Sequence, residues 1–193
     1  LFLYNQQYPD NPLVNFTKLS EINEGNKINI QTNNIKLSNI QRQIKKSIIK
    51  IFNKDVFENG VYLKLNAGQG KSYIAASLIA SIKKKTLIIV HRRSIIDQWA
   101  KVINTAFPNT TVGYYYSNKK VDGDIIIMVN RSCLQKEYTI NNKTMPRTEY
   151  YAQFGFVIVD EAHECASKQM QSILKYVQTY YILALSATPI TKV

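Results

Sequence analysis

The chain has 193 residues, of which 45% are hydrophobic and 20% charged, and its formal net charge at pH 7 is +12. A chain of this length forms one domain and buries roughly 70% of the surface that it exposes when unfolded, so it needs no disulfide or metal for stability. The composition excludes a disordered tail, and no apolar run reaches the ~20 residues of a membrane span. The excess of lysine and arginine indicates a polyanionic partner.

The two cysteines, Cys133 and Cys165, lie outside any CxxC or Cys/His spacing, so we predict no zinc site. Scattered thiols are typical of a reducing compartment, and we expect an intracellular location, cytoplasmic or nuclear. The first residues lack the basic segment and cleavage site of a secretory signal peptide. Because the chain does not begin with Met, we expect it to be part of a longer protein.

Residues 1–36 are polar and rich in asparagine, and we expect them to form an N-terminal extension or accessory segment. Within them, Ile28 and Ile30 alternate with polar residues, which predicts a short strand. Isoleucines at a spacing of three to four predict a helix over residues 37–59, ended by Asn59-Gly60. Periodic apolar residues predict three further helices: 71–83, 94–106 and 167–179.

Short β-branched runs alternate with these helices. They predict six strands: Val61–Leu65, Leu87–Val90, Val112–Tyr116, Ile125–Val129, Phe156–Val159 and Ile182–Leu185. Several runs are apolar on both faces, as strands are when helices cover both sides of a parallel sheet. The fold class predicted is therefore α/β, with a parallel sheet and helices on both faces. Ligands of such sheets bind at the carboxyl ends of the strands.

A glycine-rich segment follows the first of the long strands, directly before a predicted helix. It consists of Asn66-Ala67-Gly68-Gln69-Gly70-Lys71-Ser72. Glycines let backbone N–H groups turn toward phosphate oxygens, and the helix N-terminus favours negative charge. In such a loop Lys71 would reach the β- and γ-phosphates of a nucleotide, and Ser72 would bind Mg²⁺. Leu65 replaces the first glycine of the strict phosphate-loop pattern, and the alternative is a glycine-rich turn.

An acidic pair, Asp160-Glu161, comes directly after the strand Phe156–Val159. Beside a phosphate loop, Asp160 can hold Mg²⁺, and Glu161 can orient and deprotonate the water that attacks the γ-phosphoryl group. The alternative is a solvated helix start, where carboxylates are favoured by the helix dipole.

These segments, taken in order, resemble the motifs of superfamily 2 helicases and translocases of the DExH/DEAH type. The matching segments are Leu37–Arg42, whose Gln41 takes the place of an adenine-reading glutamine; Asn66–Ser72, motif I; Thr86–Arg93 with Asp97-Gln98-Trp99, motif Ia; Asp124–Leu134, motif Ib; Asp160–His163, motif II; and Ser186–Pro189, motif III. Within the superfamily the wording of motif Ia is nearest to DNA-repair and transcription helicases and to transcript-release helicases of large DNA viruses. A viral protein of this kind would act in a viral factory or virion.

The resemblance implies that residues 37–193 form the first RecA-like motor domain, an ATP-binding domain that works with Mg²⁺. It implies nucleotide contacts by Gln41, Gly68, Gln69, Gly70, Lys71 and Ser72, with catalysis by Lys71, Asp160 and Glu161. It implies nucleic-acid contacts by Arg92, Arg93 and Asn130, where Asn130 replaces the usual threonine, and coupling through His163, Ser186 and Thr188. The partner expected is DNA, with RNA left open, together with a second RecA-like domain that this chain does not contain. No membrane contact is expected.

The function predicted is the ATP-binding half of a nucleic-acid helicase or translocase, weak or inactive in hydrolysis without the second domain. Two alternatives stay open: a motor that moves on duplex without separating strands, and a nucleic-acid clamp that keeps the fold and does not hydrolyse ATP. Tyr114, Tyr115 and Tyr116 favour a strand over a base-stacking platform, and Trp99 is expected to pack in the core.

Overall fold

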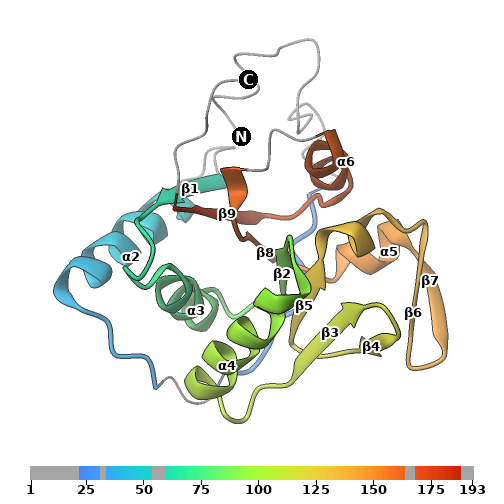
Figure 1. Ribbon diagram of the computed structural model, residues 1–193, viewed down its shortest axis with the longest axis horizontal. Coiled ribbons are helices and arrows are strands. Elements are labelled where there is room, and N and C mark those ends of the chain that lie inside the picture. The colour runs from blue at the N-terminus through green and yellow to red at the C-terminus, as the bar shows by residue number, and fades with distance from the viewer. Residues whose placement is uncertain (1–21, 31–33, 54–59, 164–167, 188–193) are drawn as a thin grey trace.

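The computed structural model describes residues 22–30, 34–53, 60–163 and 168–187. Its centre is a seven-stranded sheet of order β1-β9-β8-β2-β5-β3-β4 (Figure 1). The strands are β1 (Gly60–Lys64), β2 (Thr86–Val90), β3 (Val112–Tyr116), β4 (Lys119–Val121), β5 (Ile125–Val129), β8 (Phe156–Val159) and β9 (Tyr181–Ser186). All neighbouring strands are parallel except β3 and β4. The predicted fold class, a RecA-like α/β domain, is confirmed.

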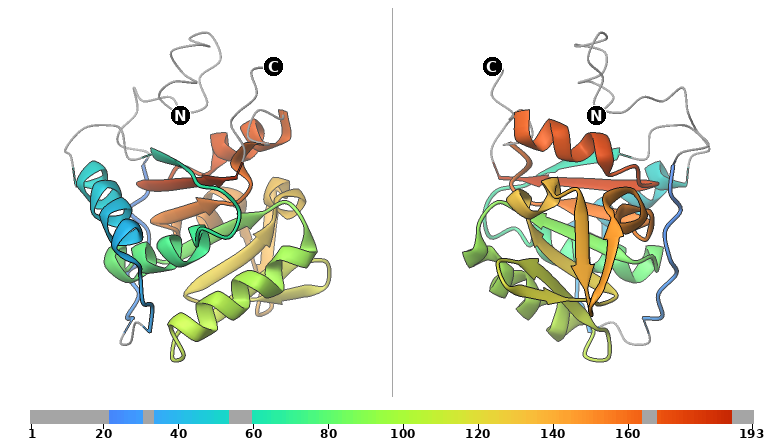
Figure 2. Two further views of the ribbon diagram at one scale, coloured as in Figure 1. Left: turned by 60° about the vertical axis from the view of Figure 1, so that its left-hand side comes forward. Right: turned by 90° about the vertical axis from the view of Figure 1, so that its right-hand side faces the viewer.

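Helices cover both faces of the sheet (Figures 1 and 2). One face packs on α2 (Asn39–Phe52), α3 (Lys71–Ile82) and α4 (Ile96–Ala106), and the other on α5 (Arg147–Ala152) and α6 (Lys168–Tyr176). Consecutive residues of a strand alternate between the two cores: Ile88 belongs to the first, whereas Leu87 and Ile89 belong to the second. Because helices shield both faces from solvent, the central strands carry apolar side chains throughout. These uninterrupted apolar runs are what allowed the strands to be predicted from the sequence.

The bounds of β3, β5 and β8 agree with the sequence prediction, and those of β1, β2, β9, α3 and α6 differ by a few residues. The predicted helix 94–106 begins as a 3₁₀ turn, η2 (Arg93–Ile95), before α4. The helix predicted over 37–59 ends at Phe52, although residues 54–59 lie outside the described part. No helix among the described residues is long and apolar enough to cross a membrane.

The short strand predicted around Ile28 and Ile30 is wrong. Both side chains are buried, but residues 22–30 make only isolated bridges, between Asn23 and Thr179 and between Lys27 and Lys84. The alternation of apolar and polar residues therefore comes from two isoleucine side chains that pack against the core, in a segment that does not join a β-sheet.

A hairpin and a short helix were not predicted. β6 (Glu137–Ile140) and β7 (Lys143–Pro146) pair with each other outside the main sheet and lead into α5. The turn residues Asn141 and Asn142 both have positive φ, of 51° and 61°, as the two-residue turns favoured in hairpins require.

Buried tyrosines hold this hairpin and α5 against the sheet. The rings of Tyr138 and Tyr150 stack with centroids 4.0 Å apart. The hydroxyl of Tyr151 donates to the backbone oxygen of Cys133 at 2.7 Å and lies 2.8 Å from that of Tyr138. Cys133 belongs to η3 (Asn130–Leu134), so these contacts join the hairpin to the turn that follows β5. Tyr115 points into the same cluster from β3, where the three consecutive tyrosines form a strand as predicted.

Stability is expected to fall at alkaline pH. Burial raises the pKa of the Cys133 thiol to about 12 and raises the pKa values of the Tyr138, Tyr150 and Tyr151 hydroxyls above their usual range. The folded chain therefore keeps protons that the unfolded chain releases above about pH 9, and each such group lowers the free energy of unfolding by ~1.4 kcal/mol per pH unit.

Urea unfolding between about pH 7 and pH 11 measures this slope. Tyr151→Phe removes one titrating group, so we expect a shallower slope, together with a loss of about 1–3 kcal/mol at pH 7 from the unpaired Cys133 carbonyl. The exposed Tyr73→Phe is the control and should leave both quantities unchanged. Equal slopes for wild type and Tyr151→Phe would contradict the burial argument.

Candidate nucleotide site

The glycine-rich loop connects the edge strand β1 to α3, as the sequence predicted. Gly70 caps α3 in a left-handed conformation with φ 81°, and Gly68 has φ 78°. α3 begins at Lys71, whose Nζ donates to the backbone oxygen of Leu65 at 3.0 Å, across the loop. An ammonium group has three N–H donors, so two remain for other acceptors at this position. Two glycines with positive φ directly before a helix N-terminus are features that a phosphate-binding turn requires.

Gln41 fastens the loop to α2. Its Nε2 donates to the backbone oxygen of Gln69 at 3.0 Å. The same side chain closes a capping box, because its Oε1 accepts from the backbone N–H of Ser38 at 2.9 Å. Gln69 in turn accepts from the N–H of Asn66 at 2.9 Å through its side chain. Gln41 therefore lies beside the loop but does not line the cavity described below, and its predicted contact with the nucleotide stays a prediction.

Asp160 follows β8, and its carboxylate is held by two N–H donors. Oδ1 accepts from the backbone N–H of Glu161 at 3.0 Å, and Oδ2 accepts from the indole Nε1 of Trp99 at 2.8 Å. A carboxylate has about four acceptor positions, so half of them stay open. β9 lies between β1 and β8, which puts Asp160 and the loop on the same edge of the sheet, one strand apart.

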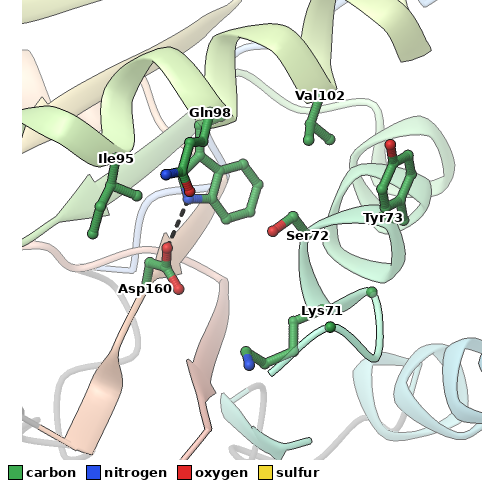
Figure 3. A pocket seen from close by; sticks show the side chains of 10 residues that line it. Lys71, Ser72, Tyr73, Ile95, Gln98, Val102 and Asp160 are labelled. Carbon is green, nitrogen blue, oxygen red and sulfur yellow. Dashed lines mark hydrogen bonds between the residues drawn. The ribbon is translucent and has the colours of Figure 1, made fainter. Parts of the chain in front are cut away.

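A cavity of about 270 Å³ joins the two segments (Figure 3). Its lining contains five of the predicted residues: Gly68, Gly70, Lys71, Ser72 and Asp160. Figure 3 shows the Ser72 hydroxyl and the Asp160 carboxylate facing the same space from opposite walls. The structure thus brings together residues that are almost 90 positions apart in the sequence.

Glu161, His163 and Ser186 form a second group beside Asp160. Oε2 of Glu161 lies 3.2 Å from Nδ1 of His163, and the Ser186 hydroxyl lies 3.3 Å from the same nitrogen. His163 and Ser186 are thus in contact, while the coupling role predicted for them stays a prediction, and Thr188 lies outside the described residues. Glu161 has a φ of 52°, a left-handed conformation that costs a non-glycine residue about 1–3 kcal/mol and often occurs at functional sites.

Arg92, Arg93 and Asn130 lie apart from the cavity, after two neighbouring strands. The last residues of β2 and β5, Val90 and Val129, are partners in the ladder, so the three predicted nucleic-acid contacts follow the same edge of the sheet. Both arginines are exposed, and the Arg93 guanidinium lies 4.9 Å from the Tyr116 ring centroid. The Asn130 side-chain oxygen accepts from the N–H of Arg131 at 2.7 Å, which directs its amide nitrogen to other acceptors.

The donor set fits a magnesium nucleotide. Mg²⁺ in phosphate sites takes one or two protein oxygens, with waters and phosphates completing its shell, and Ser72 and Asp160 supply a hydroxyl and a carboxylate. A Cβ at Gly68 would meet no atom within 4 Å, so backbone N–H groups can approach a phosphate there. The ammonium group of Lys71 would supply positive charge for the phosphate oxygens of such a nucleotide.

The third wall of the cavity, which η2 and α4 form, was not predicted from the sequence. It consists of Ile95, Gln98, Trp99 and Val102, from η2 and α4, while Tyr73 lies beside the loop. Trp99 is buried, as expected, with an exposed fraction of 2%, but it also contacts the carboxylate of Asp160. A signal existed: a buried indole N–H needs an acceptor, and the helix after the second strand faces the loop in this fold.

The family model described as "Type III restriction enzyme, res subunit" matches residues 16–191, and the chain belongs to this family. Among curated proteins, the chain is 32% identical over 141 residues to the "Putative ATP-dependent RNA helicase QP509L" of African swine fever virus (strain Badajoz 1971 Vero-adapted). That match covers 68% of this chain and 25% of the relative. The "Putative helicase 161L" of Invertebrate iridescent virus 6 is 32% identical over 157 residues, or 77% of this chain and 32% of the relative. The chain thus spans a quarter to a third of these relatives.

Solved structures show the same fold. The SWI2/SNF2 ATPase core of Sulfolobus solfataricus, in complex with dsDNA, superposes with a TM-score of 0.61 at 18% identity, over 86% of this chain and 34% of that chain. The UvsW helicase of bacteriophage T4 gives 0.59 at 18% identity, over 84% and 57%. The family match and these neighbours confirm that the chain is a first motor domain of the superfamily 2 helicase type.

The contact between Gly70 and Gln41 can be tested by stability alone. Alanine at Gly70 or Gly68 must adopt a positive φ, which costs about 1–2 kcal/mol at either position. At Gly70 the new Cβ would also clash with Nε2 of Gln41, whereas at Gly68 it would meet open space. We therefore expect Gly70→Ala to lower the free energy of urea unfolding more than Gly68→Ala. Adding Gln41→Ala should recover part of the Gly70→Ala loss, and equal losses for the two glycines would contradict this geometry.

Proposed function

We propose that the chain is the ATP-binding half of a motor that moves on DNA and that hydrolyses ATP when joined to a second RecA-like domain. The observation that carries the proposal is the shared cavity, in which the loop before α3 and the carboxylate after β8 face each other. The family and the viral relatives support an ATP-dependent helicase. The proposal places the working protein inside cells, and in a viral factory or virion if it is viral.

The side chains of the cavity divide the work as follows. Lys71 and the loop N–H groups bind the β- and γ-phosphates, and Ser72 and Asp160 hold Mg²⁺. The bound ion supplies positive charge that stabilises the transferring phosphoryl group. Glu161 orients the attacking water and accepts its proton. Gln41, fixed by Ser38 beside the loop, contacts the base.

The exposed strand ends bind the nucleic acid. Arg92 and Arg93 donate to backbone phosphates as guanidinium forks, and Asn130 donates through its amide nitrogen. His163 and Ser186, together with Thr188, connect this surface to the phosphate end of the cavity. The net charge of +12 favours binding to a polyanion. Contacts to the phosphate backbone do not read the base sequence, so neither feature distinguishes DNA from RNA. We propose DNA because the structure of one fold neighbour was solved in complex with dsDNA. The swine fever virus relative is named a putative RNA helicase, so the experiment below also includes RNA.

The decisive experiment measures ATP hydrolysis by the longer protein that contains this chain, alone and with single-stranded DNA, duplex DNA or RNA. Stimulation by DNA supports the proposal, and stimulation by RNA alone reassigns the track. A strand-displacement assay separates unwinding from movement along an intact duplex. Nucleic-acid affinity that ignores nucleotide, without turnover, would favour the alternative function of a non-hydrolysing clamp.

Two substitutions are expected to separate binding from chemistry. Glu161→Gln keeps the size and hydrogen bonding of the side chain but removes the base, so hydrolysis should fall by about 10²-fold or more while MgATP affinity stays near wild type. Lys71→Ala should weaken MgATP binding itself. Steady-state turnover and a nucleotide titration of each variant provide the measurement, and equal loss of affinity in both would contradict the assigned roles.

The 193-residue chain alone is expected to bind MgADP and to hydrolyse ATP poorly. Arginine fingers are worth ~10³–10⁵ in rate in related phosphoryl-transfer enzymes, and in this fold they come from the second domain. Thermal shift with MgADP, with Lys71→Ala as control, measures binding, and a coupled assay measures turnover. Turnover by the chain alone at the rate of the longer protein would overturn this expectation.

A further inference from the structure

Trp99 occupies an unusual place for a buried aromatic residue. It is the fourth residue of α4, with only 2% of its surface exposed, and it lines the cavity. Its ring packs in the core between α3, α4 and the sheet, on the same face of α4 as Ile96 and Ile103. These contacts hold the indole in one orientation, so its N–H points to a fixed position.

That position is occupied by the Asp160 carboxylate. The indole Nε1 donates to Oδ2 at 2.8 Å, the dashed line in Figure 3. A buried indole N–H needs an acceptor, but any backbone oxygen would serve. Here the acceptor is instead the one acidic side chain in the lining of the cavity.

The two donors on Asp160 together orient its carboxylate. The N–H of Glu161 holds Oδ1, and it belongs to the adjacent residue on the same chain segment. The Trp99 donor comes from another element and holds Oδ2, so rotation of the carboxylate breaks at least one hydrogen bond. About two acceptor positions of the carboxylate stay open, and Figure 3 shows the Ser72 hydroxyl facing the same cavity.

We propose that Trp99 is a positioning residue for the cation that accompanies the nucleotide, acting through its hydrogen bond to Asp160. The inference rests on the proposed function, because it assigns Mg²⁺ to Ser72 and Asp160. Partners that orient metal-binding side chains contribute about 10–100-fold to metal affinity. This role can be distinguished from packing, because the loss of a packing contact would weaken nucleotide binding equally with and without the metal.

The test compares nucleotide binding with and without the metal. Trp99→Phe keeps an aromatic ring and removes the N–H. For the 193-residue chain, titrated with a fluorescent ADP analogue, we expect the Mg²⁺ concentration needed for half-maximal binding to rise about tenfold. Affinity for the same analogue in EDTA should stay near wild type. Ile103→Val, which trims a buried side chain one turn further along the same face of α4 but outside the lining of the cavity, is the matched control and should leave the Mg²⁺ requirement unchanged.

A double-mutant cycle then locates the effect. In an Asp160→Asn background, Trp99→Phe should add nothing further to the Mg²⁺ requirement, since the carboxylate through which it acts is gone. Trp99 is also the one tryptophan of the 193 residues, so its emission reports directly on this contact. Adding Mg²⁺ to the ADP-loaded wild type should change the emission, and Asp160→Asn should abolish that change.

The outcomes distinguish this inference from the proposed function. If the wild-type chain shows no nucleotide binding that depends on Lys71, the proposed function fails, and the inference falls with it. If wild type binds with a clear Mg²⁺ requirement that Trp99→Phe leaves unaltered, only the inference is overturned. Equal weakening by Trp99→Phe with Mg²⁺ and in EDTA, or losses additive with Asp160→Asn, would likewise reduce Trp99 to a packing residue.

Discussion

The structure depends on one constraint: in the middle of the sheet, neither face is in contact with solvent. All residues of β2 and β8 are buried, because helices cover both sides. Polar side chains can then reach solvent and one another only where the strands end. The loop after β1, Asp160 after β8, Ser186 at the end of β9 and the arginines after β2 all lie on one edge for this reason. The candidate functional residues gather at this edge because burial leaves no room for polar side chains along the middle of the strands.

The same constraint explains which parts of the fold were predictable. β5 and β8 are apolar without interruption, so the sequence alone showed their bounds. The β6–β7 hairpin has exposed positions and only two deeply buried side chains, Tyr138 and Ile140, and its place depends on tyrosines of α5. Contacts of that kind join segments whose local sequence shows no common period. Ile28 and Ile30 are the reverse case, where a two-residue period arises from burial without strand pairing.

The candidate site divides along a similar line. The loop from Gly68 to Ser72 and the pair Asp160-Glu161 are contiguous segments, and the chemistry of each could be predicted from residue types and from the strand before it. The other wall of the cavity comes from α4, where Trp99 stands 61 residues before its hydrogen-bond partner. Periodicity assigned Trp99 correctly to a buried helix face. Periodicity could not show that the indole N–H of Trp99 meets the Asp160 carboxylate, because that contact depends on where α4 lies relative to the end of β8.

Three neighbouring elements support the segments around the cavity. α2 supports the loop through Gln41, α4 supports Asp160 through Trp99, and β9 supports the segment after Asp160 through Ser186 and His163. α4 follows directly on η2, which begins at the exposed Arg93, so one 3₁₀ turn separates this arginine from the helix that holds the carboxylate. The hydrogen bond of Trp99 therefore connects the carboxylate at the cavity to the helix that follows the exposed arginines of the strand-end surface.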